Sequence, residues 1–130
     1  MGKSVADAVL DASLNYLKNN VTKLVVCTSE PTTYSEATAG LSSSGFALAD
    51  VVVNSADFTV GAGVVSGRKV QVGAQTSVSI DSTGTAGHIA LVVTGSSAAL
   101  LYVTTCTALA LTSGSKVNTP AFNIELRDPS

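Results

Sequence analysis

Residues 82–115, STGTAGHIALVVTGSSAALLYVTTCTALALTSGS, run for 34 positions without one Asp, Glu, Lys or Arg. Thr, Val, Ala and Leu dominate this stretch, and Gly or Ser interrupts each apolar run. Those residue types are typical of β-strands separated by turns. Because soluble domains average about 25% charged residues, so long an uncharged stretch indicates strands whose outer side meets another protein. The stretch therefore predicts a β-rich chain that associates with copies of itself.

Short strands are also predicted on both sides of this stretch. Apolar or alternating runs, bounded by Gly, Ser, Asn or Asp, predict strands at 23–28, 46–53, 57–65, 68–74, 77–81, 88–95, 100–112 and 121–128. Short strands at this spacing are typical of a β-sandwich or a small barrel. The predicted fold is therefore mainly β, or α+β once the helix described next is included.

The first residues predict the one convincing helix, over 4–18. Ser4 is a suitable N-cap, and Asn19–Asn20 supplies a stop. Apolar and small residues recur three and four positions apart, as they do on a helix that packs on a core. This stripe consists of Ala6, Val9, Leu10, Ser13, Leu14 and Leu17, and is widened by Val5, Ala12 and Tyr16.

Residues 29–45 predict a long exposed loop between the first two strands. Pro31 and repeated Ser, Thr and Gly favour turns there, and Tyr34 is the one aromatic residue in the segment. A loop of this length is either functional or ordered by a neighbour. The 130 residues fit a single domain over 1–130, with a helix at 4–18, the loop at 29–45 and a β-rich remainder at 46–128.

The composition favours a surface that packs against other proteins. Charged residues make up only 12% of the chain, whereas Ser and Thr together supply 32 residues. The formal charge of -2, with scattered basic residues, disfavours nucleic acid as a partner. The apolar runs are far shorter than the roughly 20 residues of a membrane-spanning helix, so no membrane association is expected.

Cys27 and Cys106 are the two cysteines, and both lie inside apolar, β-branched runs. Neither belongs to a Cys-x-x-Cys pair or a Cys/His cluster, so no metal site is predicted. Two alternatives remain open. The thiols are either buried and free, or joined in a disulfide within the chain or between subunits.

The chain offers little for catalysis. His88 is the only histidine, and it begins a predicted strand without a nucleophile motif beside it, which favours a structural role. The segment GAGVVSGRK (61–69) has glycines but lacks the spacing of a phosphate-binding loop. We therefore expect no enzymatic activity, no catalytic residues and no cofactor.

Two long stretches resemble small virion proteins encoded by tailed bacteriophages and prophages. The opening, VADAVLDASLNYLKNNVTKLVVCTSEPTTYSEA (5–37), is similar to their "ADAVLDAALNYIK" helix followed by a "PTTYxEA" segment. The later part is similar to their SGRK, TGTAxHxALV, LLYVTTC, LTxGxxVNxPA and IExxDP elements. These elements stand here at 66–69, 83–92, 100–106, 111–121 and 124–129.

This resemblance implies a virion structural protein, made in the cytoplasm of a bacterial host. Among virion roles we favour a capsid decoration or cement protein, which sits on the lattice of the major capsid protein as a homotrimer. Tyr34, Thr104 and Thr107 are the candidate interface residues. The alternatives are a tail-fibre or receptor-binding module and a head–tail connector component.

Overall fold

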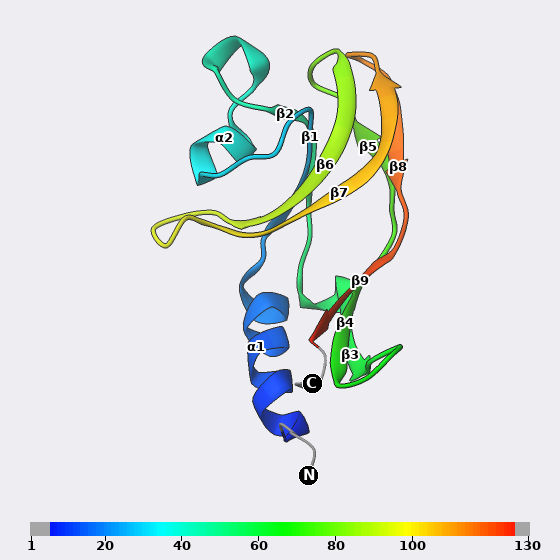
Figure 1. Cartoon of the computed structure of the whole chain (residues 1–130). Coiled ribbons are helices and arrows are strands. Elements are labelled where there is room, and N and C mark those ends of the chain that lie inside the picture. Colours follow the sequence, from blue (N-terminus) through cyan, green and yellow to red (C-terminus); the bar gives the residue numbers. More distant parts are fainter. Residues whose placement is uncertain (1–5, 127–130) are drawn as a thin grey trace. The chain divides into compact units, whose positions relative to one another are not determined.

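The computed structural model describes residues 6–126, and these form two compact units (Figure 1). Unit 1 contains residues 6–20, 54–74 and 120–126, and unit 2 contains residues 21–53 and 75–119. Each unit is therefore assembled from separate stretches of the chain. The single domain over 1–130 stays a prediction.

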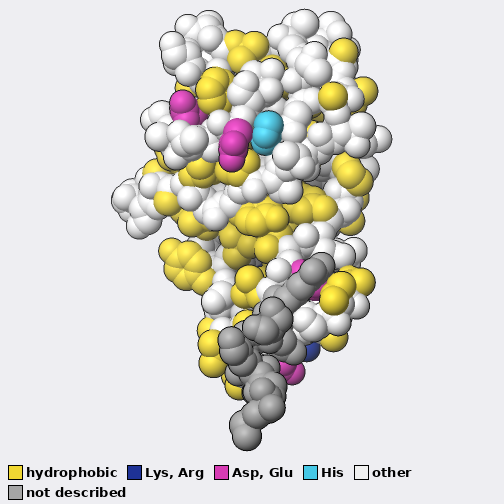
Figure 2. Space-filling view, in the orientation of Figure 1, with side chains coloured by type: hydrophobic (Ala, Val, Ile, Leu, Met, Phe, Trp, Pro, Cys, Tyr) yellow, Lys and Arg dark blue, Asp and Glu magenta, His cyan; other side chains and the backbone are white. Residues whose placement is uncertain are grey.

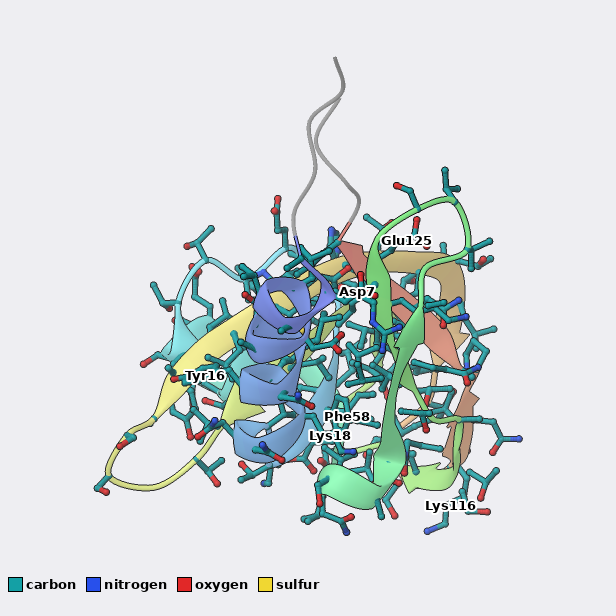
Figure 3. All side chains as sticks on the ribbon, turned by 90° about the horizontal axis from the view of Figure 1, so that it is seen from below. Asp7, Tyr16, Lys18, Phe58, Lys116 and Glu125 are labelled. Atoms are coloured by element: carbon teal, nitrogen blue, oxygen red, sulfur yellow. The ribbon has the colours of Figure 1, made fainter. Side chains whose placement is uncertain are left out.

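Unit 1 consists of one helix and a three-stranded antiparallel sheet of order β3-β4-β9. The helix α1 packs on β3 and β4, and the buried side chains between them are aliphatic apart from Phe58. Figure 3 shows Phe58 on the side of β3 that faces α1. The elements are α1 (Asp7–Asn20), the 3-10 turn η2 (Ser55–Asp57), β3 (Phe58–Ala62), β4 (Arg68–Val72) and β9 (Phe122–Leu126).

The observed helix differs from the predicted one in its end and in its buried face. It continues to Asn20, whose side-chain amide donates a hydrogen bond of 2.7 Å to the carbonyl of Tyr16. The predicted cap Ser4 lies outside the described residues. Leu10 and Leu14 are buried, but Val9 is 61% exposed and Tyr16 is 60% exposed. The predicted stripe was too wide, because α1 covers only one small sheet.

Two carboxylates tie unit 1 together. Asp11 on α1 accepts a 2.7 Å hydrogen bond from Nε of Arg68 on β4, and this contact raises the pKa of Arg68. Glu125 on β9 accepts hydrogen bonds from the backbone N–H groups of Val64 and Val65, at the tip of the β3–β4 hairpin. The side chains of both valines project into solvent.

Unit 2 holds a four-stranded antiparallel sheet of order β2-β1-β6-β7 and a two-stranded sheet, β5-β8. A single antiparallel bridge between Ala49 and Ile80 links β2 to the residue that follows β5. The elements are β1 (Lys23–Cys27), α2 (Tyr34–Thr38), the 3-10 turn η1 (Leu41–Ser43), β2 (Ala47–Val52), β5 (Gln75–Ser79), β6 (Gly84–Val93), β7 (Ala99–Leu111) and β8 (Lys116–Thr119).

The prediction of a mainly β, sandwich-like fold with one N-terminal helix is confirmed. Every predicted strand has an observed counterpart, with ends that differ by a few residues. The strand β8 was missed, and β6 begins at Gly84, four residues before the predicted start at 88. The predicted last strand ended at 128, beyond the described residues, and within them β9 ends at Leu126.

The prediction of a loop over 29–45 is wrong in its secondary structure, although many residues of the segment are exposed. The segment contains α2 and η1, and Ala37 of α2 is completely buried in a core cluster with Val25 and Cys27. The N-cap Thr33 accepts a 3.1 Å hydrogen bond from the backbone N–H of Glu36. The carboxylate of Glu36 accepts hydrogen bonds from the hydroxyl and backbone N–H of Thr32, which lower its pKa. The segment is therefore ordered by contacts within unit 2.

Candidate functional site: an uncharged edge strand

The strand β7 is the longest in the described chain, with 13 residues, and it lies at an edge of the four-stranded sheet. Its register with β6 runs from Val93 opposite Ala99 to Gly84 opposite Leu111. In an antiparallel ladder, backbone groups point alternately to the two sides of a strand. β7 therefore has a row of N–H and C=O groups directed away from β6, available to another strand.

The second half of β7 is open on both faces of the sheet as well. Thr105, Thr107, Ala108, Leu109 and Ala110 are all exposed, and Cys106 between them is half-buried. Leu109 alone exposes 53% of its surface. Successive strand residues point to opposite faces, so consecutive exposure means that neither face is covered here.

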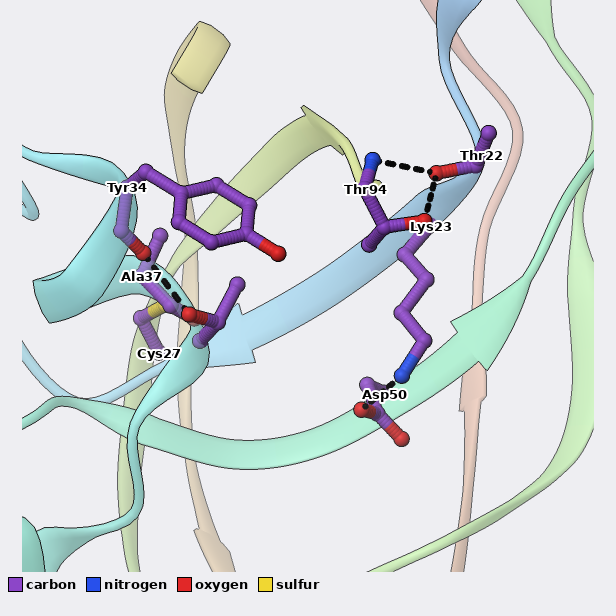
Figure 4. A network of polar contacts seen from close by, with 8 residues as sticks. Thr22, Lys23, Cys27, Tyr34, Ala37, Asp50 and Thr94 are labelled. Carbon is purple, nitrogen blue, oxygen red and sulfur yellow. Dashed lines mark hydrogen bonds and ion pairs between the residues drawn. The ribbon is translucent and has the colours of Figure 1, made fainter. Parts of the chain in front are cut away.

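Natural sheets usually protect an open edge with charged residues, proline, a bulge or a covering segment. β7 has no charged residue and no proline along its whole length. The opposite edge strand, β2, contains Asp50. Its Oδ2 atom forms an ion pair with Nζ of Lys23 at 3.1 Å (Figure 4). β2 also meets Gly40 and Ile80 through isolated bridges. Both edge strands have a register irregularity, but only β2 also has a charged residue and isolated bridges, so β7 is the less protected edge.

Two irregularities interrupt the register of β7 with β6, and the larger one lies in the second half of β7. Ala86 of β6 lies opposite Leu109, but His88 lies opposite Thr105. Three residues of β7, 106–108, therefore face the single residue Gly87, which makes a β-bulge. The second shift skips Leu101, between Tyr102 opposite Leu91 and Leu100 opposite Val92. Bulges bend a strand locally, so regular pairing runs over 102–105 before the larger bulge and over 109–111 after it.

The candidate interface residues are placed differently by the structure. Thr107 lies in the bulge and is exposed, whereas Thr104 lies opposite Ile89 and is half-buried. Tyr34 belongs to α2, where its ring packs half-buried against the cluster around Cys27 and Ala37 (Figure 4). Thr104 and Thr107 thus share one strand, and Tyr34 is part of the packing of unit 2. The exposure of Leu109 was not singled out from the sequence.

The surface around β7 carries few charges. Figure 2 shows hydrophobic and uncharged polar side chains over most of the face of unit 2 that carries this strand. Such a surface loses little hydration energy when another protein covers it, because few ions have to be stripped of water. The arrangement is suited to association and offers few groups for binding a charged ligand.

Both cysteines are free thiols in the structure. Cys27 is completely buried on β1, and its Sγ lies 3.8 Å from the carbonyl oxygen of Ala37 (Figure 4). Burial, with a smaller contribution from nearby Cys106, raises the pKa of Cys27 to about 12. Because β6 separates β1 from β7, the two strands that carry the cysteines lie roughly 9.5 Å apart across the sheet. A disulfide needs less than about 7 Å, so pairing within the chain requires backbone movement.

His88 lies in the interior of β6 rather than at the start of a strand, because β6 begins four residues earlier. It stands opposite Cys27 on one side and Thr105 on the other. Its Nδ1 atom is buried and makes no hydrogen bond. Among residues 6–126, no three His, Cys, Asp or Glu side chains are grouped so that they would hold a metal ion.

None of the helices within the described residues is long and apolar enough to cross a membrane. Comparison of the chain with protein-family models, with curated proteins and with solved structures gives no match. The candidate role of the open edge of β7 therefore rests on the geometry and the chemistry of this strand alone.

Proposed function

We propose that this chain is a non-enzymatic structural protein of a bacteriophage virion that self-associates and binds the major capsid protein. The observation that carries the proposal is β7, a long edge strand without charge that is exposed on both faces over residues 107–110. Its virion setting rests on the resemblance of residues 5–37 and 66–129 to small phage virion proteins. Within the virion, a decoration or cement protein is the role we favour.

The proposed mechanism is mechanical. A protein that covers the joints of a capsid lattice holds neighbouring capsid subunits together against internal pressure. The Thr, Ala and Leu side chains of β7 bury easily in such contacts because their desolvation costs little. The resemblance favours three copies around a threefold axis, and closed symmetric rings are the usual form of such assemblies.

Copy number in the particle is the measurement that tests this function. Particles released from cells that carry this coding sequence are purified, and peptides of the chain and of the major capsid protein are quantified by mass spectrometry. A decoration protein is expected in a number comparable to that of the major capsid protein. A cytoplasmic host protein, measured in the same samples, controls for carry-over.

The other outcomes separate the alternatives. A few copies per particle would contradict the decoration role and favour a tail-fibre, receptor-binding or head–tail connector component. Absence of the chain from purified particles, while it is present in the cells, would overturn the virion assignment altogether.

A further inference from the structure

We infer that β7 pairs with β7 of a second copy, antiparallel and across a two-fold axis, so that two four-stranded sheets become one. The inference rests on the self-association in the proposed function, but it replaces the threefold axis that the resemblance favours with a two-fold axis. The chain order β2-β1-β6-β7 leaves β7 with one paired side and one open side. An identical strand, reversed by a two-fold axis, offers the same open side in return.

The charge pattern favours a second copy over an unrelated strand. No residue from 82 to 115 is charged, so two copies of β7 meet without like charges facing each other. A strand from a charged partner would bury its ions against a surface that has no countercharge, and this costs free energy. The open edge is therefore complementary to itself.

The bulge at residues 106–108 indicates where the two-fold axis crosses the paired strands. Residues 106–108 form the bulge, and its middle residue Thr107 is also near the middle of residues 105–110, which are exposed except for the half-buried Cys106. An axis near Thr107 brings the bulge of each copy opposite the other bulge. The regular residues before the bulge then pair with the regular residues after it in the second copy. Residues 103–111 of both copies pair in this way, which exceeds the mean strand length of about 5 to 6 residues.

This geometry gives the pairing a direct chemical probe. With the axis at Thr107, the half-buried Cys106 lies opposite Ala108 of the second copy. The two Cys106 residues then lie within about 10 Å of each other, from the strand spacing and the rise per residue. Cys27 lies on the central strand β1 and is completely buried, so it serves as the matched thiol.

The first test is crosslinking with a short bismaleimide reagent, in which each thiol adds across one maleimide double bond. The protein with Cys27→Ala retains only Cys106, and we expect it to yield covalent dimers at low micromolar concentration. The matched protein with Cys106→Ser retains only Cys27, and we expect no dimer from it in the folded state. Equal yields from both proteins would overturn the inference.

The second test needs no cysteine substitution and uses sedimentation velocity. Thr107→Lys places two lysines near the axis, and we expect the dissociation constant of the dimer to rise at least about tenfold. The matched control is Val52→Lys, on the opposite edge strand β2, where the side chain is 71% exposed. We expect this control to dimerise like the unchanged protein.

The outcomes distinguish the inference from the proposed function. A trimer without Cys106 crosslinks would overturn the β7 pairing while supporting self-association in the virion role. A strict monomer would also overturn the pairing, and the copy number in particles then decides the virion role independently. A dimer, or a multiple of it, that is lost with Thr107→Lys and retained with Val52→Lys supports the pairing.

Discussion

Cys27 and Cys106 have the same side chain but lie on a central strand and an edge strand of one sheet. Cys27 is enclosed by Val25, Ala37 and Ala90, and burial disfavours its thiolate. Cys106 is half-buried, and burial raises its pKa as well. A thiol reacts as its thiolate, so the reagent needs both ionisation and access. The position of each strand in the sheet therefore sets the reactivity of its cysteine.

We predict that a thiol reagent at about pH 8 labels Cys106 in the folded protein and labels Cys27 only after unfolding. At this pH the side chain of Cys27 stays protonated, because its pKa is about 12 instead of the ordinary value of 9.0. Mass spectrometry of the labelled peptides measures the two rates. The protein with Cys106→Ser is the control, and fast labelling of its Cys27 under native conditions would contradict the predicted burial.

The same pKa fixes the sign of a pH effect on stability. The folded pKa of Cys27 is raised, so its contribution to stability is fully present below about pH 9 and declines as the pH rises toward 12. Between these limits the unfolded chain loses the proton while the folded chain keeps it. Cys27→Ala removes this dependence, and the alkaline fall in unfolding free energy should be shallower in that variant.

Among the elements, the strands were predicted best from the sequence. Alternation at Val70 and Val72 and the continuous apolar run at 23–28 define strands locally, because a half-buried and a fully buried strand have distinct patterns. β8 was missed because its four residues, Lys116–Thr119, are too few to show a pattern. The helix α2 was missed because Ser and Thr dominate its segment. The signal was present in Thr33 and Glu36, whose spacing is that of a capping box.

The width of the α1 stripe was predicted wrongly, since a helix pattern does not state how much of the helix a sheet will cover. Leu14 is 2% exposed and packs in unit 1, whereas Val9 is 61% exposed. Tyr16 projects from the side of α1 away from that sheet (Figure 3). The apolar residues at Val9 and Tyr16 therefore add little to the packing of unit 1.

This difference gives a prediction for the helix. Leu14→Ala should lower the free energy of unfolding by about 2 to 4 kcal/mol, because it removes buried methyl groups and leaves a cavity. Val9→Ala should change it by less than about 0.5 kcal/mol, because the side chain is mostly in solvent. Urea denaturation followed by circular dichroism measures both. Equal losses in the two variants would show that Val9 is buried in solution.

For the whole molecule, the candidate site depends on strand order, which no local pattern specifies. The uncharged run 82–115 predicted self-association, and Thr104 and Thr107 were chosen from it as outward-facing hydroxyls. Whether a strand is central or at an edge is decided by partners far along the chain. β6, for example, is a central strand because the distant strand β1 pairs with one of its sides. Tyr34 was chosen as the one aromatic residue of a predicted loop, and Leu109 was overlooked because its exposure follows from the edge position of β7.

Association has a thermodynamic consequence for the whole protein. A second copy that binds only the folded chain stabilises it by mass action, so the melting temperature should rise with protein concentration. In Thr107→Lys this rise should be smaller or begin at a higher concentration, because the weakened dimer forms only there. Thr104→Lys should instead melt lower at every concentration, because Thr104 is half-buried beside Ile89. Calorimetry across a hundredfold concentration range checks all three proteins. If the melting temperature of the unchanged protein stayed constant over this range, association through β7 would be excluded. A folded chain that binds a second copy must be more stable than the same chain alone.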